Sequence, residues 1–125
     1  MVVTDERVAR FVSDRVGQGF VPPYTCLGTE RDGEIINGVI FNCFEGADVH
    51  VSIAGRGWTK GFLADVGHYV FGVLRCERIT VQTEQPAIVR IAERLGGQVE
   101  GLKRNHFGKG RDAFIVGILS SEYRF

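Results

Sequence analysis

The sequence predicts an α/β domain in which helices cover a mixed β-sheet. Two stretches, 62–74 and 87–95, repeat apolar residues at helical spacing, and each lies between strand-like stretches. Pairs of strand-like segments joined by short turns precede the first stretch and follow the second. Helices between strands indicate crossovers, whereas tight turns indicate antiparallel hairpins. We therefore expect both kinds of pairing in one sheet.

The first half of the chain predicts one helix followed by three strands. Thr4 is expected to cap the helix, whose apolar residues fall on one face and which ends at a glycine. That face comprises Val8, Phe11, Val12 and Val16, and Gly17 follows it. Strands are expected at 24–29, 35–44 and 49–53, because apolar or alternating stretches are separated there by turn residues.

The second half predicts two helices and three strands. A helix of about 16 residues begins at Trp58 or Thr59, and a second runs from Pro86 to Leu95. Strands are expected at 79–81, 98–105 and 113–119. We predict that the helices at 59–74 and 86–95 lie on opposite faces of the sheet, because both are right-handed crossovers. A cleft is expected between the strand ending near Ile53 and the strand beginning near Ile79.

Composition and charge narrow the classes of function. The chain has 125 residues, 44% of them apolar, which is enough for one domain with a buried core. Fifteen basic and fifteen acidic residues give zero net charge, which argues against a dedicated nucleic-acid binder. No apolar run approaches the ~20 residues of a membrane span, and no signal peptide is recognisable, so we expect a cytoplasmic protein. Cys26, Cys43 and Cys76 are far apart, which predicts reduced, buried thiols and no metal site.

Several strings in the C-terminal third occur together with this order of elements. Gln85-Pro86-Ala87 opens a helix that ends in Leu95-Gly96-Gly97, and Val99-Glu100-Gly101 begins the next strand. Arg111-Asp112-Ala113 then leads into the last apolar strand. From Val8 to Leu119 the chain resembles the GNAT N-acetyltransferase superfamily. In its length and in the string Trp-Thr-Lys-Gly-Phe-Leu at 58–63, it is most similar to short GNAT-like proteins of phage genomes.

The resemblance implies a single GNAT-like domain over residues 1–125, with a strongly twisted mixed sheet and helices on both faces. It implies an acetyl-CoA-dependent N-acetyltransferase that moves an acetyl group to a primary amine by direct attack in a ternary complex. The implied partners are an amine-bearing small molecule or protein and a second copy in a homodimer, in a bacterial cell that phage can infect. Ala92 stands where the family often has a catalytic tyrosine, and Gln85 where it has asparagine. A non-catalytic binding or assembly protein of phage origin is therefore the alternative.

The loop Ala54-Gly55-Arg56-Gly57 precedes a predicted helix and is a candidate phosphate site. Backbone N–H groups at a helix start are unpaired and lie at the positive end of the helix dipole, so they favour a pyrophosphate. Arg56 and Lys60 can add charge-assisted hydrogen bonds. Alternatively, the turn needs glycine for its backbone alone. The resemblance implies coenzyme A as the ligand, with contacts at Val51, Ile53, Gly55, Arg56, Gly57, Thr59, Lys60, Gly61 and Gln85.

Polar residues alternate along the strand before this loop. Asp48, His50 and Ser52 project from one face. An imidazole can accept, near neutral pH, the proton that an ammonium group must lose before it attacks a thioester. His50 is therefore the first candidate base, and either Glu45 in the preceding turn or Asp48 is the second. Ser52 is a further catalytic candidate. The resemblance also implies an oxyanion-binding N–H within 51–53. Alternatively, His50 is a half-buried structural residue.

Overall fold

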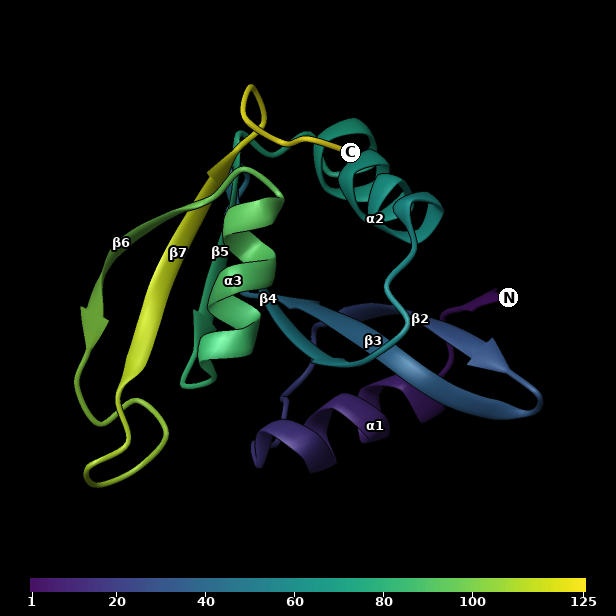
Figure 1. The fold of residues 1–125 in the computed structure, drawn as a ribbon, viewed down its shortest axis with the longest axis horizontal. Coiled ribbons are helices and arrows are strands. Elements are labelled where there is room, and N and C mark those ends of the chain that lie inside the picture. Colours follow the sequence, from purple (N-terminus) through teal and green to yellow (C-terminus); the bar gives the residue numbers. More distant parts are fainter.

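The computed structural model describes all 125 residues and contains one seven-stranded sheet. The strands are β1 (Val2–Val3), β2 (Thr25–Arg31), β3 (Glu34–Asn42), β4 (Asp48–Gly55), β5 (Arg78–Thr83), β6 (Gln98–Lys103) and β7 (Ala113–Leu119). They lie in the order β1-β2-β3-β4-β5-β7-β6, and β4 and β5 form the only parallel pair. Figure 1 shows two arms of the sheet, β1–β4 and β5–β7–β6, which diverge from each other. The mixed, twisted sheet that the sequence predicts is confirmed.

Three α-helices and one π-helix pack against this sheet. They are α1 (Glu6–Val16), α2 (Lys60–Gly67), η1 (His68–Val73) and α3 (Pro86–Arg94). Asp5, not Thr4, caps α1, because its side chain accepts a hydrogen bond from the Arg7 N–H. The predicted helix at 59–74 is found as α2 and η1. In its last part the Leu74 N–H donates to the Tyr69 carbonyl, five residues back, which widens the helix into a π-helix.

The two faces of the sheet carry separate apolar clusters. On one face, Val8 and Val12 of α1 pack on Ile40 and Ala54. On the other face, α2 and α3 share one cluster with β3, β4, β5 and β7, through residues such as Phe62 and Ile88. In Figure 1, α2 and α3 lie between the two arms, whereas α1 lies beyond the β2–β4 arm. Helices therefore cover both faces, but α2 and α3 do not lie on opposite faces, and that prediction is wrong.

The direction of the crossovers explains this correction. The β4–α2–β5 connection moves one strand along the sheet, and the β5–α3–β6 connection moves further the same way, past β7. Two right-handed crossovers that advance in one direction place both helices on the same face. The sequence does not reveal that β7 pairs between β5 and β6, so it does not reveal the direction of the second crossover.

The parallel ladder between β4 and β5 is short. It runs from Asp48–Arg78 to Val51–Val81, although both strands continue beyond it. The two strands therefore separate after Val51, at the place where a cleft was expected. This separation, hereafter the gap, divides the two arms of the sheet.

Three smaller observations complete the comparison with the sequence. β1 was not expected, because two residues are too few for a strand pattern. Cys26 and Cys76 are buried, but Cys43 is exposed, so the expectation that all three thiols are buried is wrong. Cys43 follows the end of β3 and has φ 51°, which turns the chain away from the sheet.

None of the helices has both the length and the apolar character that crossing a membrane requires.

Candidate functional site

The loop between β4 and α2 turns at two glycines, Gly55 and Gly57. Both have positive φ, but a side chain would fit less well at Gly55 than at Gly57. Gly55 has φ +106°, and a Cβ on it would lie 2.3 Å from the Ile36 carbonyl oxygen. Gly57 has φ +74°, but a Cβ there would meet only the flexible end of the Ile36 side chain, at 2.8 Å. Gly55 is therefore required by the turn itself, with or without a ligand. Gly57 leaves room for a test substitution.

The side chain of Asn37, on β3, holds this loop in place through hydrogen bonds. Its side chain is buried, and its Nδ2 donates to the carbonyls of Arg56 at 2.9 Å and Gly57 at 3.4 Å. Its Oδ1 accepts from the Thr29 N–H at 3.1 Å. Because the C=O and N–H of a trans peptide point in opposite directions, these bonds turn the N–H groups of Gly57 and Trp58 away from the sheet. The sequence analysis missed Asn37, whose amide within the apolar run 35–41 is its one local signal and does not by itself indicate a site.

The backbone that follows presents a row of free donors. None of the five N–H groups from Gly57 to Gly61 has an acceptor within the chain. Thr59 caps α2, and its hydroxyl oxygen accepts from the Phe62 N–H at 3.0 Å. We call the segment Gly57–Gly61 the N–H cradle. Such a row at a helix start binds anions.

Three cationic side chains surround the N–H cradle. Two of them, Arg56 and Lys60, are exposed and form no ion pair. The third is Arg31 at the end of β2, whose guanidinium lies 3.9 Å from the position of a Cβ on Gly57. Arg31 likewise forms no ion pair. Its approach to Gly57 depends on the pairing of β2, β3 and β4, so the local sequence does not mark Arg31 as a site residue.

The gap lies directly before the N–H cradle, and one backbone N–H group of β4 faces it. The Arg56 N–H donates to the Ile36 carbonyl on β3, so by alternation the N–H groups of Ala54 and Ser52 also face β3. The Ile53 N–H therefore faces the β5 side, beyond the end of the parallel ladder. The side chains of Val51 and Ile53 point to the face that carries α2 and α3.

Two small hollows flank the gap. One of about 10 Å³ is lined by Ser52 and Gln82 from one face and by Ile53 and Ile88 from the other, so it connects the two faces of the sheet. Gln85 also lines it. The second, of about 20 Å³, is entirely apolar and lies between α2 and α3, beside Trp58. Both are narrow in this structure, so an extended ligand arm would enter only when the side chains lining them move.

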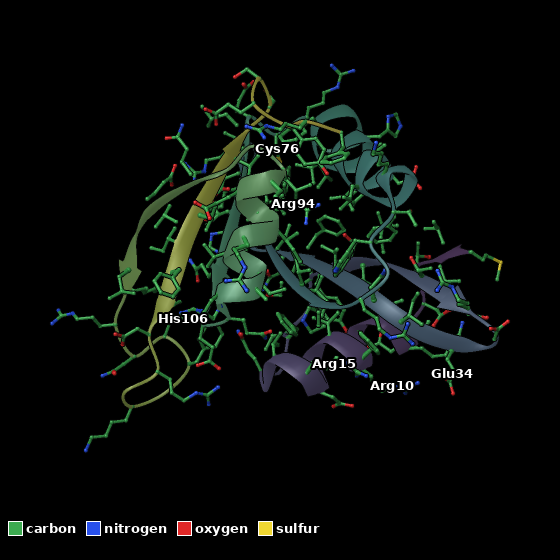
Figure 2. All side chains as sticks on the ribbon, in the orientation of Figure 1. Arg10, Arg15, Glu34, Cys76, Arg94 and His106 are labelled. Atoms are coloured by element: carbon green, nitrogen blue, oxygen red, sulfur yellow. The ribbon has the colours of Figure 1, made fainter.

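On the α1 side of the sheet, polar residues form a larger cavity of about 160 Å³, here called the polar cavity. His50 and Ser52 of β4, Gln82 of β5 and Lys103 of β6 line it, together with His106 from the β6–β7 hairpin. Figure 2 shows His106 at the hairpin end of β6 and β7. Burial, with the nearby charges of Lys103 and His50, lowers the pKa of His106, so this imidazole is neutral at pH 7.

A chain of polar contacts orients His50. Its Nε2 lies 3.6 Å from Oδ2 of Asp48, and Oδ1 of Asp48 accepts from the Thr80 hydroxyl at 2.8 Å. The Arg78 Nε in turn donates to the Thr80 Oγ1 at 3.2 Å, and Arg78 also pairs with Glu100. These contacts hold the Asp48 carboxylate beside His50, where it can stabilise a protonated imidazole.

The structure brings most of the predicted residues together and leaves one apart. His50 and Ser52 line the polar cavity, while Val51, Ile53 and Gln85 lie around the gap. Gly55, Arg56, Gly57, Thr59, Lys60 and Gly61 form or adjoin the N–H cradle. Glu45 is exposed in the turn before β4 and lines none of these cavities.

No tyrosine hydroxyl is free to act near the gap. Ala92 is fully buried in the α3 interface. The hydroxyls of Tyr24, Tyr69 and Tyr123 bond to Glu6, Thr25 and the Leu63 carbonyl, respectively. Burial raises the pKa of Tyr123 to about 12, so this phenol keeps its proton at neutral pH.

Comparison with known proteins gives structural likeness without sequence likeness. Neither a protein-family model nor a curated protein matches the chain. A mutant form of the spermidine/spermine N-acetyltransferase SpeG from Vibrio cholerae superposes with a TM-score of 0.73 at 17% identity, over 98% of this chain and 96% of that chain. A chimera of the Vibrio cholerae enzyme with hSSAT gives a TM-score of 0.66 at 19% identity, over 80% and 68% of the two chains. A T. thermophilus protein provisionally assigned as an acetyltransferase gives 0.66 at 21% identity, over 82% and 62%. The chain thus has the fold of the GNAT acetyltransferases.

Proposed function

We propose that this protein is an acetyl-CoA-dependent N-acetyltransferase that acts on a primary amine. The observation that carries the proposal is the N–H cradle, whose free donors and three cations lie beside the only parallel pair of strands, at the point where that pair separates. A phosphate-bearing ligand at the N–H cradle is thereby positioned next to an opening that connects both faces of the sheet. The likeness in fold to N-acetyltransferases supports the same assignment.

The residues present fit coenzyme A. Its pyrophosphate would accept hydrogen bonds from the N–H groups between Gly57 and Gly61, while Arg31, Arg56 and Lys60 would pair with phosphate charge. Its thiol arm would enter the gap between β4 and β5, where Val51, Ile53 and Gln85 would contact it. When bound, acetyl-CoA supplies a thioester, whose carbonyl carbon is the electrophile.

The chain's own residues account for the proton and the charge. His50 takes a proton from the acceptor ammonium, and Asp48 stabilises the resulting imidazolium. The amine nitrogen would then form a C–N bond to the acetyl carbon while the C–S bond breaks, and the His50 proton would pass to the leaving thiolate. The extra proton left on the new amide nitrogen would be taken by the freed His50 and released to water. The Ile53 N–H faces the gap and stabilises the negative charge that develops on the carbonyl oxygen. Holding both reactants at the gap supplies much of the acceleration, so a tyrosine at position 92 is dispensable.

Calorimetric titration with acetyl-CoA tests the proposal. Binding of one molecule per chain is expected, and acetyl-CoA at 100 times its Kd should stabilise the fold by about 2.7 kcal/mol. Trp58 is the only tryptophan and lines the apolar hollow beside the gap, so its fluorescence should change over the same concentration range. Absence of heat, of a melting shift and of a fluorescence change at millimolar acetyl-CoA would refute the proposal.

A second candidate function is a non-catalytic binding protein that has kept the fold. The narrow hollows of about 10 and 20 Å³ favour it, because they leave no room for a thioester arm unless the side chains that line them move. The two functions separate when acetyl-CoA is mixed with the protein and a panel of primary amines. Release of free thiol that depends on the amine supports the enzyme, whereas binding without amine-dependent release supports the alternative.

A further inference from the structure

The His and Lys side chains that line the polar cavity have no acidic counterpart among the lining residues. Among the residues that line it, His50, Lys103 and His106 can carry positive charge, and the others are neutral, Gln18, Asn42 and Gln82 among them. No carboxylate lines it. A cavity whose ionisable groups share one sign raises the local concentration of ligands of the opposite sign.

The nearest carboxylates do not offset this charge, because arginines already pair with them. Asp48, which contacts His50, accepts from Thr80 and lies 3.6 Å from the Arg78 Nε. Glu100 is bound to the same Arg78 at 2.7 Å. Glu84, which lines the hollow at the gap, is bound by Arg111. Lys103, by contrast, has no ion-pair partner.

The polar cavity and the hollow at the gap share three lining residues, Gln18, Ser52 and Gln82. A molecule in the polar cavity therefore reaches the gap from the face opposite α2 and α3. The volume of the polar cavity, about 160 Å³, corresponds to about five water molecules, which is the size of a small head group.

We infer that the acceptor is a small amine that carries a carboxylate, which Lys103 binds through its charge and the neutral His106 through a hydrogen bond, while the amine faces His50 and the gap. This inference rests on the proposed function. The charge of Lys103 also favours the neutral form of a nearby amine, because like charges disfavour its protonation. An amine held in this way is closer to the form that attacks a thioester. A polyamine, by contrast, would place a second ammonium beside Lys103.

Three acceptor amines of similar length differ in the charge of their other end, and so test this preference. The other end of γ-aminobutyrate is a carboxylate, that of butylamine is a methyl group, and that of putrescine is an ammonium. The chain has three histidines, so their imidazole NMR signals can be followed individually. His50 and His106 report on the polar cavity, and His68, exposed in η1 on the other face, is the internal control.

We expect γ-aminobutyrate to shift the signals of His50 and His106, but not of His68, with a Kd about tenfold lower than that of putrescine. Lys103→Gln should raise the Kd for γ-aminobutyrate about threefold to fivefold, as for an exposed ion pair. Lys103→Glu should reverse the preference in favour of putrescine. Lys109→Gln is the matched control, because Lys109 lies in the same hairpin, is exposed and does not line the cavity; it should change nothing.

The inference is overturned when putrescine binds as tightly as γ-aminobutyrate, when none of the three compounds shifts the two imidazole signals, or when Lys103→Gln and Lys109→Gln have the same effect. This measurement needs no acetyl-CoA. Failure of the charge preference therefore contradicts the inference alone, whereas failure of acetyl-CoA to bind contradicts the proposed function.

Discussion

Gly57→Asp is expected to weaken coenzyme A binding while Gly57→Asn weakens it much less. Both substitutions place the same Cβ on a residue with φ +74°, 2.8 Å from the movable Cδ1 of Ile36. Both variants therefore lose a similar free energy of folding, about 1–2 kcal/mol, to the left-handed backbone conformation. Asp and Asn adopt this conformation more readily than other residues that have a side chain. They differ in one charge, and that charge would lie within the N–H cradle.

The magnitude follows from the distances. Two like charges ~4 Å apart, at an effective dielectric of about 20, repel by about 4 kcal/mol, and salt reduces this value. An aspartate at position 57 would also attract Arg31, whose guanidinium lies 3.9 Å from that Cβ position, and so would withdraw a cation from the phosphates. Even ~1.4 kcal/mol of net difference raises the Kd tenfold.

Isothermal calorimetry with coenzyme A measures both variants beside the wild type, and thermal unfolding confirms that both are folded. The expected order of affinity is wild type, then Gly57→Asn, then Gly57→Asp. If the two folded variants bind coenzyme A with Kd values within twofold of each other, the phosphates do not lie at the N–H cradle, and the reasoning is refuted.

Four further outcomes are expected. Asn37→Leu should lower the free energy of unfolding in urea by about 1–3 kcal/mol, because two loop carbonyls lose their donor, and should weaken coenzyme A binding. Arg56→Ala should weaken that binding less than Gly57→Asp, since the backbone donors remain; calorimetry in low and high salt checks this. His50→Ala should lower turnover about 10²- to 10⁴-fold and Glu45→Ala far less, and equal losses in the thiol-release assay would contradict the assignment. The pKa of His106 is lowered in the folded state, so the unfolded chain takes up this proton first. Stability should therefore fall as the pH drops below about 6.5, and more in the wild type than in His106→Gln, as urea unfolding at pH 7 and 5 would show.

Most of the fold was predictable because the local patterns agree with the final structure. The turn at Asp32-Gly33 has positive φ at both residues and closes the β2–β3 hairpin, as its sequence indicates. The α3 helix begins at Pro86 and ends within a residue of the expected position. The placement of α2 and α3 on one face was not predictable, because it depends on where β7 pairs, and no local pattern encodes a strand's neighbours.

The site was predictable in part for the same reason. The residues of the N–H cradle are consecutive, so glycine spacing and a helix start were sufficient to find them. Asn37, Arg31 and His106 reach the site from other strands and a distant hairpin, and only the sheet register brings them there. An arginine in a turn and an amide in an apolar strand are too common to indicate a site by themselves.

Amide NMR reports directly on whether coenzyme A binds at the N–H cradle. In spectra of the ¹⁵N-labelled protein titrated with coenzyme A, we expect the largest saturable shifts at the amides from Gly57 to Gly61, with smaller ones at Ile53. Gly110, in the β6–β7 hairpin, lines neither hollow nor the polar cavity and should remain unchanged. Saturable shifts that leave Gly57 and Gly61 unmoved, or no shift at any residue at millimolar coenzyme A, would show that coenzyme A does not bind at the N–H cradle.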